Sequence, residues 1–420
     1  MASWQYDQST ESNLMKVKYG KLIDKQFNQE NIIFGRMKKN EKFVGSQIEK
    51  PIIQSIGGGV SSGTLGTANR NQTAKAVITS KSVYAVVSVD RESMKASKTS
   101  EGAFVQFTKH PVQIAVRSFN RNLERMLTRN NASGAGILIT GTVGTDSNVS
   151  GAGSAGDPYI ISFNTASTYF PAEFECIEVG DILNADSEAT ELEVVDMTVT
   201  EASGYATGTI SVVGSSVKLA ADTGVAAFAE SLYIQKSKDA EMIGLKGVLE
   251  ATSGSLYSVS VGRRWQAYQK AAAAAALSTD LMNDVVINVK RRCGKAPKLI
   301  LSSYHQFIKF LNILEDAKRY PVSPRDSKLK GKVSFSAIEY VSPDGVIPVM
   351  SSRFLDSDEM FFLNDDHMEL NLRPGGLEWF DEDGTVFLRE SGDSYEARYG
   401  GYGEFFVNPH FQGLLNGLAV

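Results

Sequence analysis

The sequence predicts an α+β fold that carries a separately folded β domain as an insertion. A strand-forming segment at residues 83–89 is followed by a predicted amphipathic helix at residues 100–130. Between residues 137 and 240, Gly, Ser, Thr, Val and Ala dominate, and short apolar runs alternate with turn residues. This pattern is typical of a compact antiparallel β domain or barrel. From residue 245 onward, predicted helices and strands are mixed, so the 420 residues suggest two or three domains.

The first 80 residues combine a polar arm with a glycine-rich loop. Residues 1–50 are polar and weakly periodic, so we expect an extended arm with short helical pieces that neighbouring chains order. Five glycines lie between Gly57 and Gly66, and a segment of this composition has almost nothing apolar to bury. Its flanks at residues 51–53 and 76–79 favour strands. The sequence therefore predicts a long two-stranded loop that projects from the body.

The helix within residues 100–130 is predicted to begin at Pro111, because a proline at the first helical position loses no hydrogen bond. Apolar residues then recur at helical spacing: Val112, Val116, Phe119, Leu123, Met126 and Leu127. Arg117, Arg121 and Arg125 lie along one stripe of this helix. The sequence leaves open whether the stripe faces nucleic acid, solvent or a neighbouring subunit, since arginine is favoured at interfaces too.

The region after residue 245 is predicted to hold two helices and several strands. The alanine run at residues 271–276 predicts a helix across residues 265–288, since alanine is the best helix former. A second helix is predicted at residues 304–314. Strands are predicted at residues 298–301, 333–340, 346–350, 360–363 and 385–388.

No motif in the sequence supports catalysis. The glycine-rich loop lacks the Gly-Lys-Ser/Thr that a phosphate-binding loop needs, and residues 381–384 fit a hairpin turn better than a calcium loop. The two cysteines, Cys176 and Cys293, form no Cys-x-x-Cys and fit a reducing compartment. The histidines have no zinc-ligand spacing: they are His110, His305, His367 and His410. We therefore expect no catalytic residue, no metal and no cofactor.

Charge and hydropathy exclude further classes. The formal net charge is -5, so the basic total that is typical of sequence-specific DNA-binding proteins is missing. The sequence has no signal-peptide pattern at its start and no apolar run long enough for a transmembrane helix, so we expect a protein made and used inside a cell.

Several segments, in order, resemble the major capsid proteins of tailed phages with the Hong-Kong-97-type fold. They are residues 90–97 (DRESMKAS), 102–105 (GAFV), 119–127 (FNRNLERML), 134–138 (GAGIL), 395–399 (YEARY) and 407–410 (VNPH). In that family a strand, a short acidic segment, a long spine helix and a glycine turn follow one another, and an Asn-Pro turn follows the closing strand. The order of elements along nearly the whole chain is similar to that pattern.

The resemblance implies a domain for each segment. These are an N-terminal arm at 1–50, an extended E-loop at 51–82, a peripheral domain with the spine helix at 83–136, an inserted β domain at 137–240, a mainly axial domain at 241–375 and a return to the peripheral domain at 376–420. It also implies candidate inter-subunit residues. In the E-loop they are Gly57, Gly58, Gly59, Gly63, Leu65, Arg70 and Lys75, and on the spine helix they are Arg117, Arg121 and Arg125.

The function implied by the resemblance is structural. Copies of the chain would form the hexamers and pentamers of an icosahedral phage head that encloses double-stranded DNA without sequence specificity. Portal, separate scaffolding and decoration proteins would be partners, no membrane would be involved, and assembly would take place in the host bacterial cytoplasm. Two rivals stay open: an encapsulin-like protein nanocompartment, and a carbohydrate-binding adhesin with residues 137–240 as its β module. An enzyme that uses Cys293 or His305 ranks below both.

Overall fold

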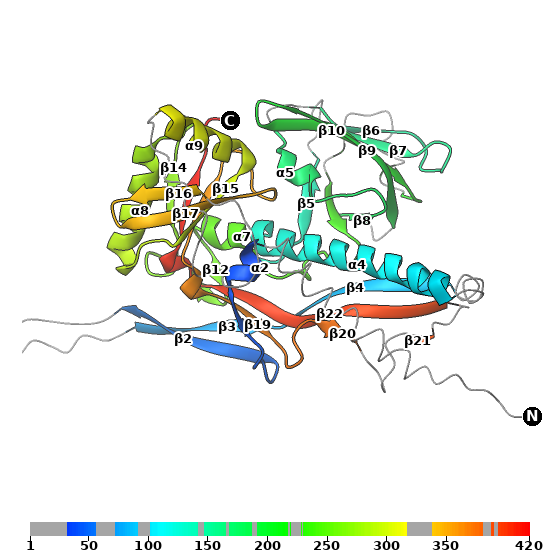
Figure 1. The fold of residues 1–420 in the computed structure, drawn as a ribbon, viewed down its shortest axis with the longest axis horizontal. Helices are drawn as coiled ribbons and strands as arrows, with labels where there is room; N and C mark the ends of the chain where they lie inside the picture. The colour runs from blue at the N-terminus through cyan, green and yellow to red at the C-terminus, as the bar shows by residue number, and fades with distance from the viewer. Residues whose placement is uncertain are drawn as a thin grey trace, which may run out of the picture.

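The structure is a computed structural model with three lobes, one of which contains a long helix that lies between the other two lobes (Figure 1). It describes residues 32–55, 72–90, 101–141, 147–164, 168–186, 191–216, 219, 228, 230–316, 338–380, 388–389 and 394–420. Three hydrophobic cores occupy the lobes, one around the long helix and one in each of the other two. Among the described residues, no helix has the length and apolar character needed to cross a membrane.

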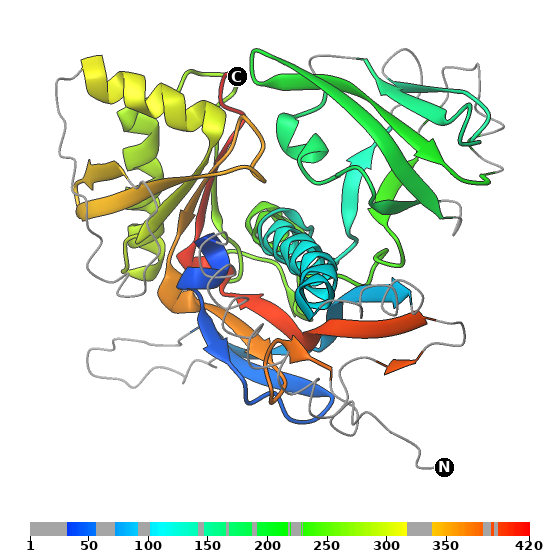
Figure 2. The same ribbon diagram turned by 45° about the vertical axis from the view of Figure 1, so that its right-hand side comes forward.

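The long helix α4 (Glu101–Arg129) lies on a ribbon made of β4 (Lys81–Asp90) and β22 (Ser394–Val407). The two strands are antiparallel, and their register runs from Ser394 opposite Asp90 to Gly403 opposite Lys81. Phe119 of α4 packs edge-on against Tyr399 of β22, with ring centroids 5.1 Å apart. Figure 2 looks nearly along α4, which lies above this ribbon and between the other two lobes.

Short strands extend this sheet. Counted over the described residues, it has six strands, in which β1 pairs in parallel with β19 and the remaining pairs are antiparallel. The added strands are β1 (Lys38–Asn40), β19 (Met368–Leu372), β20 (Glu378–Trp379) and β21 (Leu388–Arg389). A short helix, α2 (Ile32–Arg36), buries Ile33 and Phe34 in the core around α4.

A two-stranded hairpin lies below this sheet in Figure 1 and extends beyond it. It consists of β2 (Gln47–Ser55) and β3 (Gln72–Thr79), which pair antiparallel from Gln47 opposite Thr79 outward. The strand-forming flanks predicted for the glycine-rich loop are therefore confirmed as a hairpin.

The lobe between α4 and α7 is an antiparallel sheet with its own core. Within the described residues it has seven strands in the order β5-β11-β8-β9-β10-β7-β6. They are β5 (Ile137–Thr140), β6 (Ser147–Ser150), β7 (Tyr159–Phe163), β8 (Ile182–Ala185), β9 (Leu192–Ala202), β10 (Tyr205–Val213) and β11 (Ser231–Ile234). A one-turn helix, α5 (Pro171–Phe174), faces α4. The core centres on Phe163, whose ring meets the rings of Tyr169, Phe174 and Phe228 edge-on.

The chain enters and leaves this lobe at one place. The Glu241 N–H donates to the Gly134 carbonyl at 3.3 Å, and the Asp239 N–H donates to the Ala135 carbonyl at 3.1 Å. Adjacent entry and exit points are what an inserted domain requires.

The third lobe is a mixed sheet covered by helices. Over the described residues its strand order is β14-β23-β18-β15-β17-β16. These strands are β14 (Tyr268–Ala271), β15 (Leu299–Ser303), β16 (Ile338–Ser342), β17 (Gly345–Ser352), β18 (Met360–Leu363) and β23 (Gly413–Asn416). The helices are α8 (Thr279–Cys293) and α9 (Tyr304–Asp316). Along the chain, three short elements connect the β lobe to this lobe: α7 (Leu245–Glu250) and the paired strands β12 (Ser255–Leu256) and β13 (Val259–Ser260). Two short 3-10 helices precede strands: Asp365–His367 comes before β19, and Pro409–Phe411 comes before β23.

Two helix predictions are corrected by the structure. The helix begins at Glu101, so Pro111 lies inside it instead of at its start; the other hydrogen bonds of a 29-residue helix outweigh the ~3 kcal/mol that an interior proline costs. The helix predicted across residues 265–288 is wrong in its first half. Residues 268–271 form β14, and α8 begins only at Thr279.

Other elements predicted for this region are confirmed. The strand at 360–363 and the helix that begins at residue 304 are confirmed by β18 and α9. Residues 333–337 and 381–387, which carry parts of two predicted strands and the predicted hairpin turn, lie outside the described residues.

Candidate functional site

The β2–β3 hairpin is anchored at its base and open further out. The side chains of Ala76 and Ile78 are fully buried, and the Val77 N–H donates to the Tyr257 carbonyl at 2.9 Å. Ile53, nearer the other end, is 66% exposed. The hairpin therefore passes from a buried base to an exposed outer part.

Most of the predicted E-loop residues lie outside the described residues. These are Gly57, Gly58, Gly59, Gly63, Leu65 and Arg70. Lys75 is described: it is exposed on β3 and forms an ion pair with Glu49 of β2 at 2.7 Å. That ion pair crosses the hairpin, so in the single chain Lys75 supports the ribbon.

The three spine-helix arginines separate into one exposed and two buried residues. Arg117 is exposed. Arg121 is buried and forms ion pairs of 2.6 Å with both Glu178 and Asp181 of the β lobe. Arg125 is buried and pairs with Glu241. The expectation of an inter-subunit surface is therefore corrected for Arg121 and Arg125, whose guanidinium groups join the spine helix to this chain's own β lobe; for Arg117 it stays a prediction.

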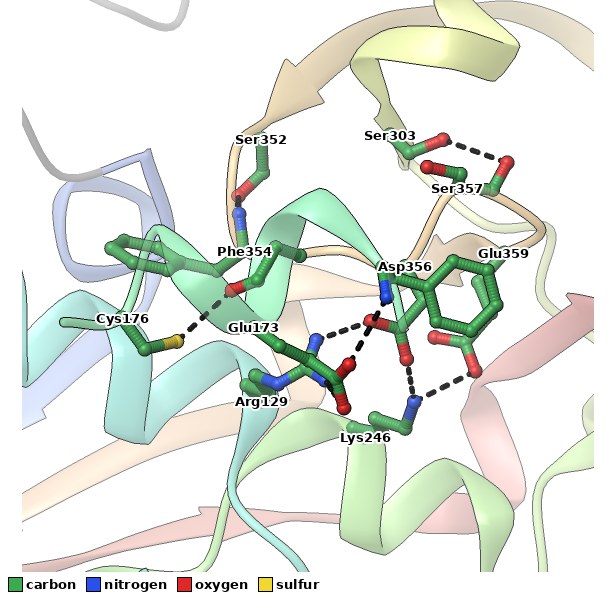
Figure 3. A network of polar contacts seen from close by, with 12 residues as sticks. Arg129, Glu173, Cys176, Lys246, Ser303, Ser352, Phe354, Asp356, Ser357 and Glu359 are labelled. Atoms are coloured by element: carbon green, nitrogen blue, oxygen red, sulfur yellow. Dashed lines mark hydrogen bonds and ion pairs between the residues drawn. The ribbon is translucent and has the colours of Figure 1, made fainter. Parts of the chain in front are cut away.

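A second buried cluster joins all three lobes; we call Arg129, Glu173, Lys246, Asp356 and Glu359 the polar hub (Figure 3). Arg129 ends α4, Glu173 lies in α5, Lys246 lies in α7, and the other two lie in the loop between β17 and β18. Asp356 is central, because both Arg129 and Lys246 pair with it.

Further contacts close the hub. Arg129 Nη2 lies 3.2 Å from Glu173 Oε1, and Lys246 Nζ lies 3.0 Å from Glu359 Oε1. Beside it, Phe354 of the same β17–β18 loop packs into the core of the β lobe. The loop thus contacts the β lobe directly through Phe354, and its Asp356 is linked to Glu173 of that lobe through Arg129.

Electrostatics distinguish the carboxyl groups of the hub. Burial alone would raise the pKa of Asp356, but the charges and hydrogen bonds of Arg129 and Lys246 outweigh it and lower the pKa. Burial raises the pKa of Glu359 despite Lys246, and the nearby Asp356 charge raises it further. Burial also raises the pKa of Glu173, although the Arg129 charge opposes this shift. The hub thus gathers two cations and three carboxyl groups away from solvent, and their pairing offsets part of the cost of burying charge.

Two further buried carboxyl groups lie in the core around α4. Glu124 Oε1 accepts the Ile33 N–H at 3.2 Å, and burial raises the pKa of Glu124 to about 7. Glu404 accepts the N–H groups of Ile243 at 2.9 Å and Phe405 at 3.0 Å, and burial raises its pKa to about 8. Both groups can lose a proton near neutral pH, which makes this core sensitive to pH.

The candidate nucleophiles and ligands are dispersed. Cys176 is buried in the β lobe, Cys293 ends α8, and both are free thiols. Burial raises the pKa of both thiols, which disfavours the reactive thiolate. Across the described ranges, no three His, Cys, Asp or Glu side chains gather as metal ligands would.

Sequence reasoning missed the polar hub. Arg129 and Asp356 are 227 positions apart, and Lys246 and Asp356 are 110 apart, so no local motif connects them. The one usable signal was Asp356 and Glu359 directly before the apolar strand at 360–363.

The chain is similar to known shell proteins. The sequence family described as SU10 major capsid protein matches residues 218–402, from just before β11 into β22. The structure titled cyanophage A-1(L) capsid asymmetric unit superposes with a TM-score of 0.55 at 9% identity, covering 93% of this chain and 94% of that chain. Gordonia phage Cozz superposes at 0.42 with 8% identity, covering 93% and 87%. No curated protein matches the chain by sequence.

Proposed function

We propose that this chain is a major capsid protein of tailed phages with the Hong-Kong-97-type fold and that it assembles into the hexamers and pentamers of an icosahedral head. The family is one of structural proteins, not of enzymes. The β2–β3 hairpin carries the proposal for how copies meet. Assembly would draw on many modest contacts of this kind instead of one strong site.

The hairpin has the properties of a strand-based contact. Among the described residues it forms a sheet of two strands alone, so its outer edge has backbone groups free to pair with another chain. Ile53 of β2 is 66% exposed, and burial of its apolar side chain by a neighbouring copy would be favourable. Its base is fixed by buried residues, so the ribbon points in a defined direction.

Replacement of residues 57–69 by a short linker tests the proposal. The variant should keep the fold of the protomer, because this segment is rich in glycine and has few apolar side chains to bury, and it should lose or distort shells. Thermal melting reports the fold, and electron microscopy of the purified full-length protein reports the shells. Normal shells from the variant, or a protomer that no longer folds, would refute the assignment.

The wider setting follows from the same proposal. The domains would have the bounds implied by the resemblance, and Arg117 and Lys75 would meet neighbouring subunits. The head would hold double-stranded DNA, take a portal, and use separate scaffolding and decoration proteins. The protein is a component of the virion capsid, and we place its assembly in the host bacterial cytoplasm.

A further inference from the structure

A surface hollow beside the end of α8 is lined by basic side chains. Its lining consists of Arg263, Arg264, Arg291, Arg292 and His410. Three separate parts of the chain supply them: the turn before β14, the last turn of α8 and the 3-10 turn after β22. Four arginines from two segments, residues 263–264 and 291–292, gather at one hollow in a chain of net charge -5, and such a concentration of positive charge attracts an anionic partner.

The turn that carries Arg263 and Arg264 is held firmly. Gly262 and Trp265 form a β-bridge, and the Trp265 N–H donates to the Gly262 carbonyl at 2.7 Å. The Trp265 ring is 1% exposed, and its Nε1–H donates to the Leu256 carbonyl at 3.0 Å. The two arginines, both exposed, therefore project from an anchored backbone.

The opposite side of the hollow is also fixed. Arg292 Nη1 donates to the Ala267 carbonyl at 3.2 Å, and its guanidinium lies 5.0 Å from the centre of the Tyr268 ring. His410 Nε2 lies 3.2 Å from the Arg292 carbonyl. Since a carbonyl only accepts, that nitrogen carries the proton in the neutral ring.

The charges of the hollow are not neutralised within the described chain. None of the four arginines forms an ion pair with an acidic side chain among the residues that the structure describes. Asp284, near Tyr268, is already paired with Lys270 at 3.0 Å. Burial lowers the pKa of Arg292, and the charges of Arg263 and Arg291 lower it further. The helix dipole favours Arg291 and Arg292 at the end of α8, but it does not account for Arg263 and Arg264.

We propose that this hollow binds phosphate groups of nucleic acid, and the proposal rests on the proposed function of a shell that encloses DNA. Guanidinium groups bind phosphate oxygens through paired hydrogen bonds, and a nucleic-acid strand presents a row of phosphates to several arginines at once. A single carboxylate of another copy would leave most of the positive charge unmatched. The nucleic-acid backbone thus fits the number and spread of these charges best.

Binding of short duplex DNA to the full-length, unassembled chain tests the proposal. Fluorescence anisotropy over a series of salt concentrations gives the slope of log affinity against log salt. For the double variant R263Q/R264Q the slope should become shallower by about 2, and for R291Q by about 1, because each phosphate contact contributes about 0.9. The control K42Q/K236Q removes two exposed charges elsewhere and should leave the slope unchanged.

A second readout reports the hollow directly. Burial lowers the pKa of His410, and Arg264 and Arg292 lower it further. A bound phosphate would oppose these charges, so the His410 pKa measured by NMR should rise when duplex is added to the wild-type chain, and it should rise less in R263Q/R264Q.

The outcomes separate the possible occupants. Unchanged slopes in R263Q/R264Q or R291Q would overturn the proposal. So would folded variants that lose shells while DNA binding is retained, because the hollow would then hold carboxylates of a second copy. Should R263Q/R264Q fail to fold, R291Q decides alone. Shell formation by the wild-type chain without DNA is scored separately, so failure of the proposed function is distinguishable from failure of this site.

Discussion

Loss of the Asp356 charge should destabilise the protein more than loss of any ordinary surface carboxylate. The side chain is 5% exposed and pairs with both Arg129 and Lys246. The substitution D356N keeps the shape and an acceptor oxygen but leaves two buried cations with one fewer anion. Removal of one partner of a buried pair costs about 3–5 kcal/mol.

The lower end of this range applies here, because Glu359 can compensate. Its carboxyl lies 3.0 Å from Lys246 and is held protonated partly by the Asp356 charge. Without that charge, the pKa of Glu359 falls and its carboxylate replaces part of what Lys246 lost. We therefore expect a loss of about 3 kcal/mol in the free energy of unfolding.

Urea denaturation followed by tryptophan fluorescence measures this loss. The slope grows with the size of the protein and is about 3 kcal/mol per M or more for a chain of this length, so at an unchanged slope a loss of about 3 kcal/mol lowers the midpoint by about 1 M or less. The matched control is D284N: Asp284 pairs with Lys270 at 3.0 Å, but both side chains are 38% exposed, so the control should cost under about 1 kcal/mol. The reasoning is refuted if the two variants have the same midpoint.

Further predictions concern pH, packing and helix capping. Burial raises the pKa of Glu404 to about 8, so the contribution of this group to stability is complete at acid pH and is lost as the pH rises through 8. The urea midpoint of the wild type should therefore fall between about pH 6 and about pH 9, and E404Q should show a smaller fall. An equal fall in both proteins would contradict this. A Cβ on Gly247 would lie 2.1 Å from the backbone just after the spine helix, so G247A should cost about 1–3 kcal/mol or more in the same assay. G35A, a helical position with open space, should be neutral or slightly stabilising, and equal costs would show that packing is not the cause. Ser278 Oγ accepts the Leu281 N–H at the start of α8, so S278A should cost about 1 kcal/mol by urea midpoint, and no loss would mean that the cap is dispensable.

Local patterns predicted those elements whose stability is decided locally. The segment 360–363 is apolar throughout, and all four residues of β18 are buried. The strand formers that flank the glycine-rich loop pair with each other, as short-range hairpins do. The amphipathic repeat of the spine helix gave the apolar face correctly, since Val116, Phe119 and Leu123 are buried.

The alanine run shows where local reasoning fails. Helix propensity is worth only tenths of a kcal/mol per residue, and backbone pairing outweighs it here. The Ala272 N–H donates to the Asn416 carbonyl at 2.8 Å, and the Ala274 N–H donates to the Gly417 carbonyl at 2.7 Å. Ala273 and Ala274 have φ values of 50° and 61°, outside the helical range. The chain's C-terminal strand thus decides this segment, and a sequence window around residue 272 does not contain it.

The same limit explains why the charged sites escaped prediction. The stripe of Arg117, Arg121 and Arg125 was visible as a helical repeat, but the acids that bury two of them come from the β lobe and its exit. Helical spacing shows on which face of the helix a side chain lies, but it does not show which other part of the chain packs against that face. The arginines of the hollow beside α8 come from two separate segments, residues 263–264 and 291–292, and only the tertiary fold brings them together.

The distribution of buried charge has a consequence for assembly. Arg121 and Arg125 join the β lobe to the spine helix, and Arg129 and Lys246 join the lobe that contains β17 and β18 to both through Asp356. Each of these contacts is desolvated, so opening one would leave unpaired charge and cost several kcal/mol. Reorientation of the lobes is therefore an expensive way to fit a chain into both hexamers and pentamers. Among the described residues, no buried ion pair of this kind holds the β2–β3 hairpin beyond its base. We expect the hairpin to adapt to the difference between the two proposed environments while the body stays rigid.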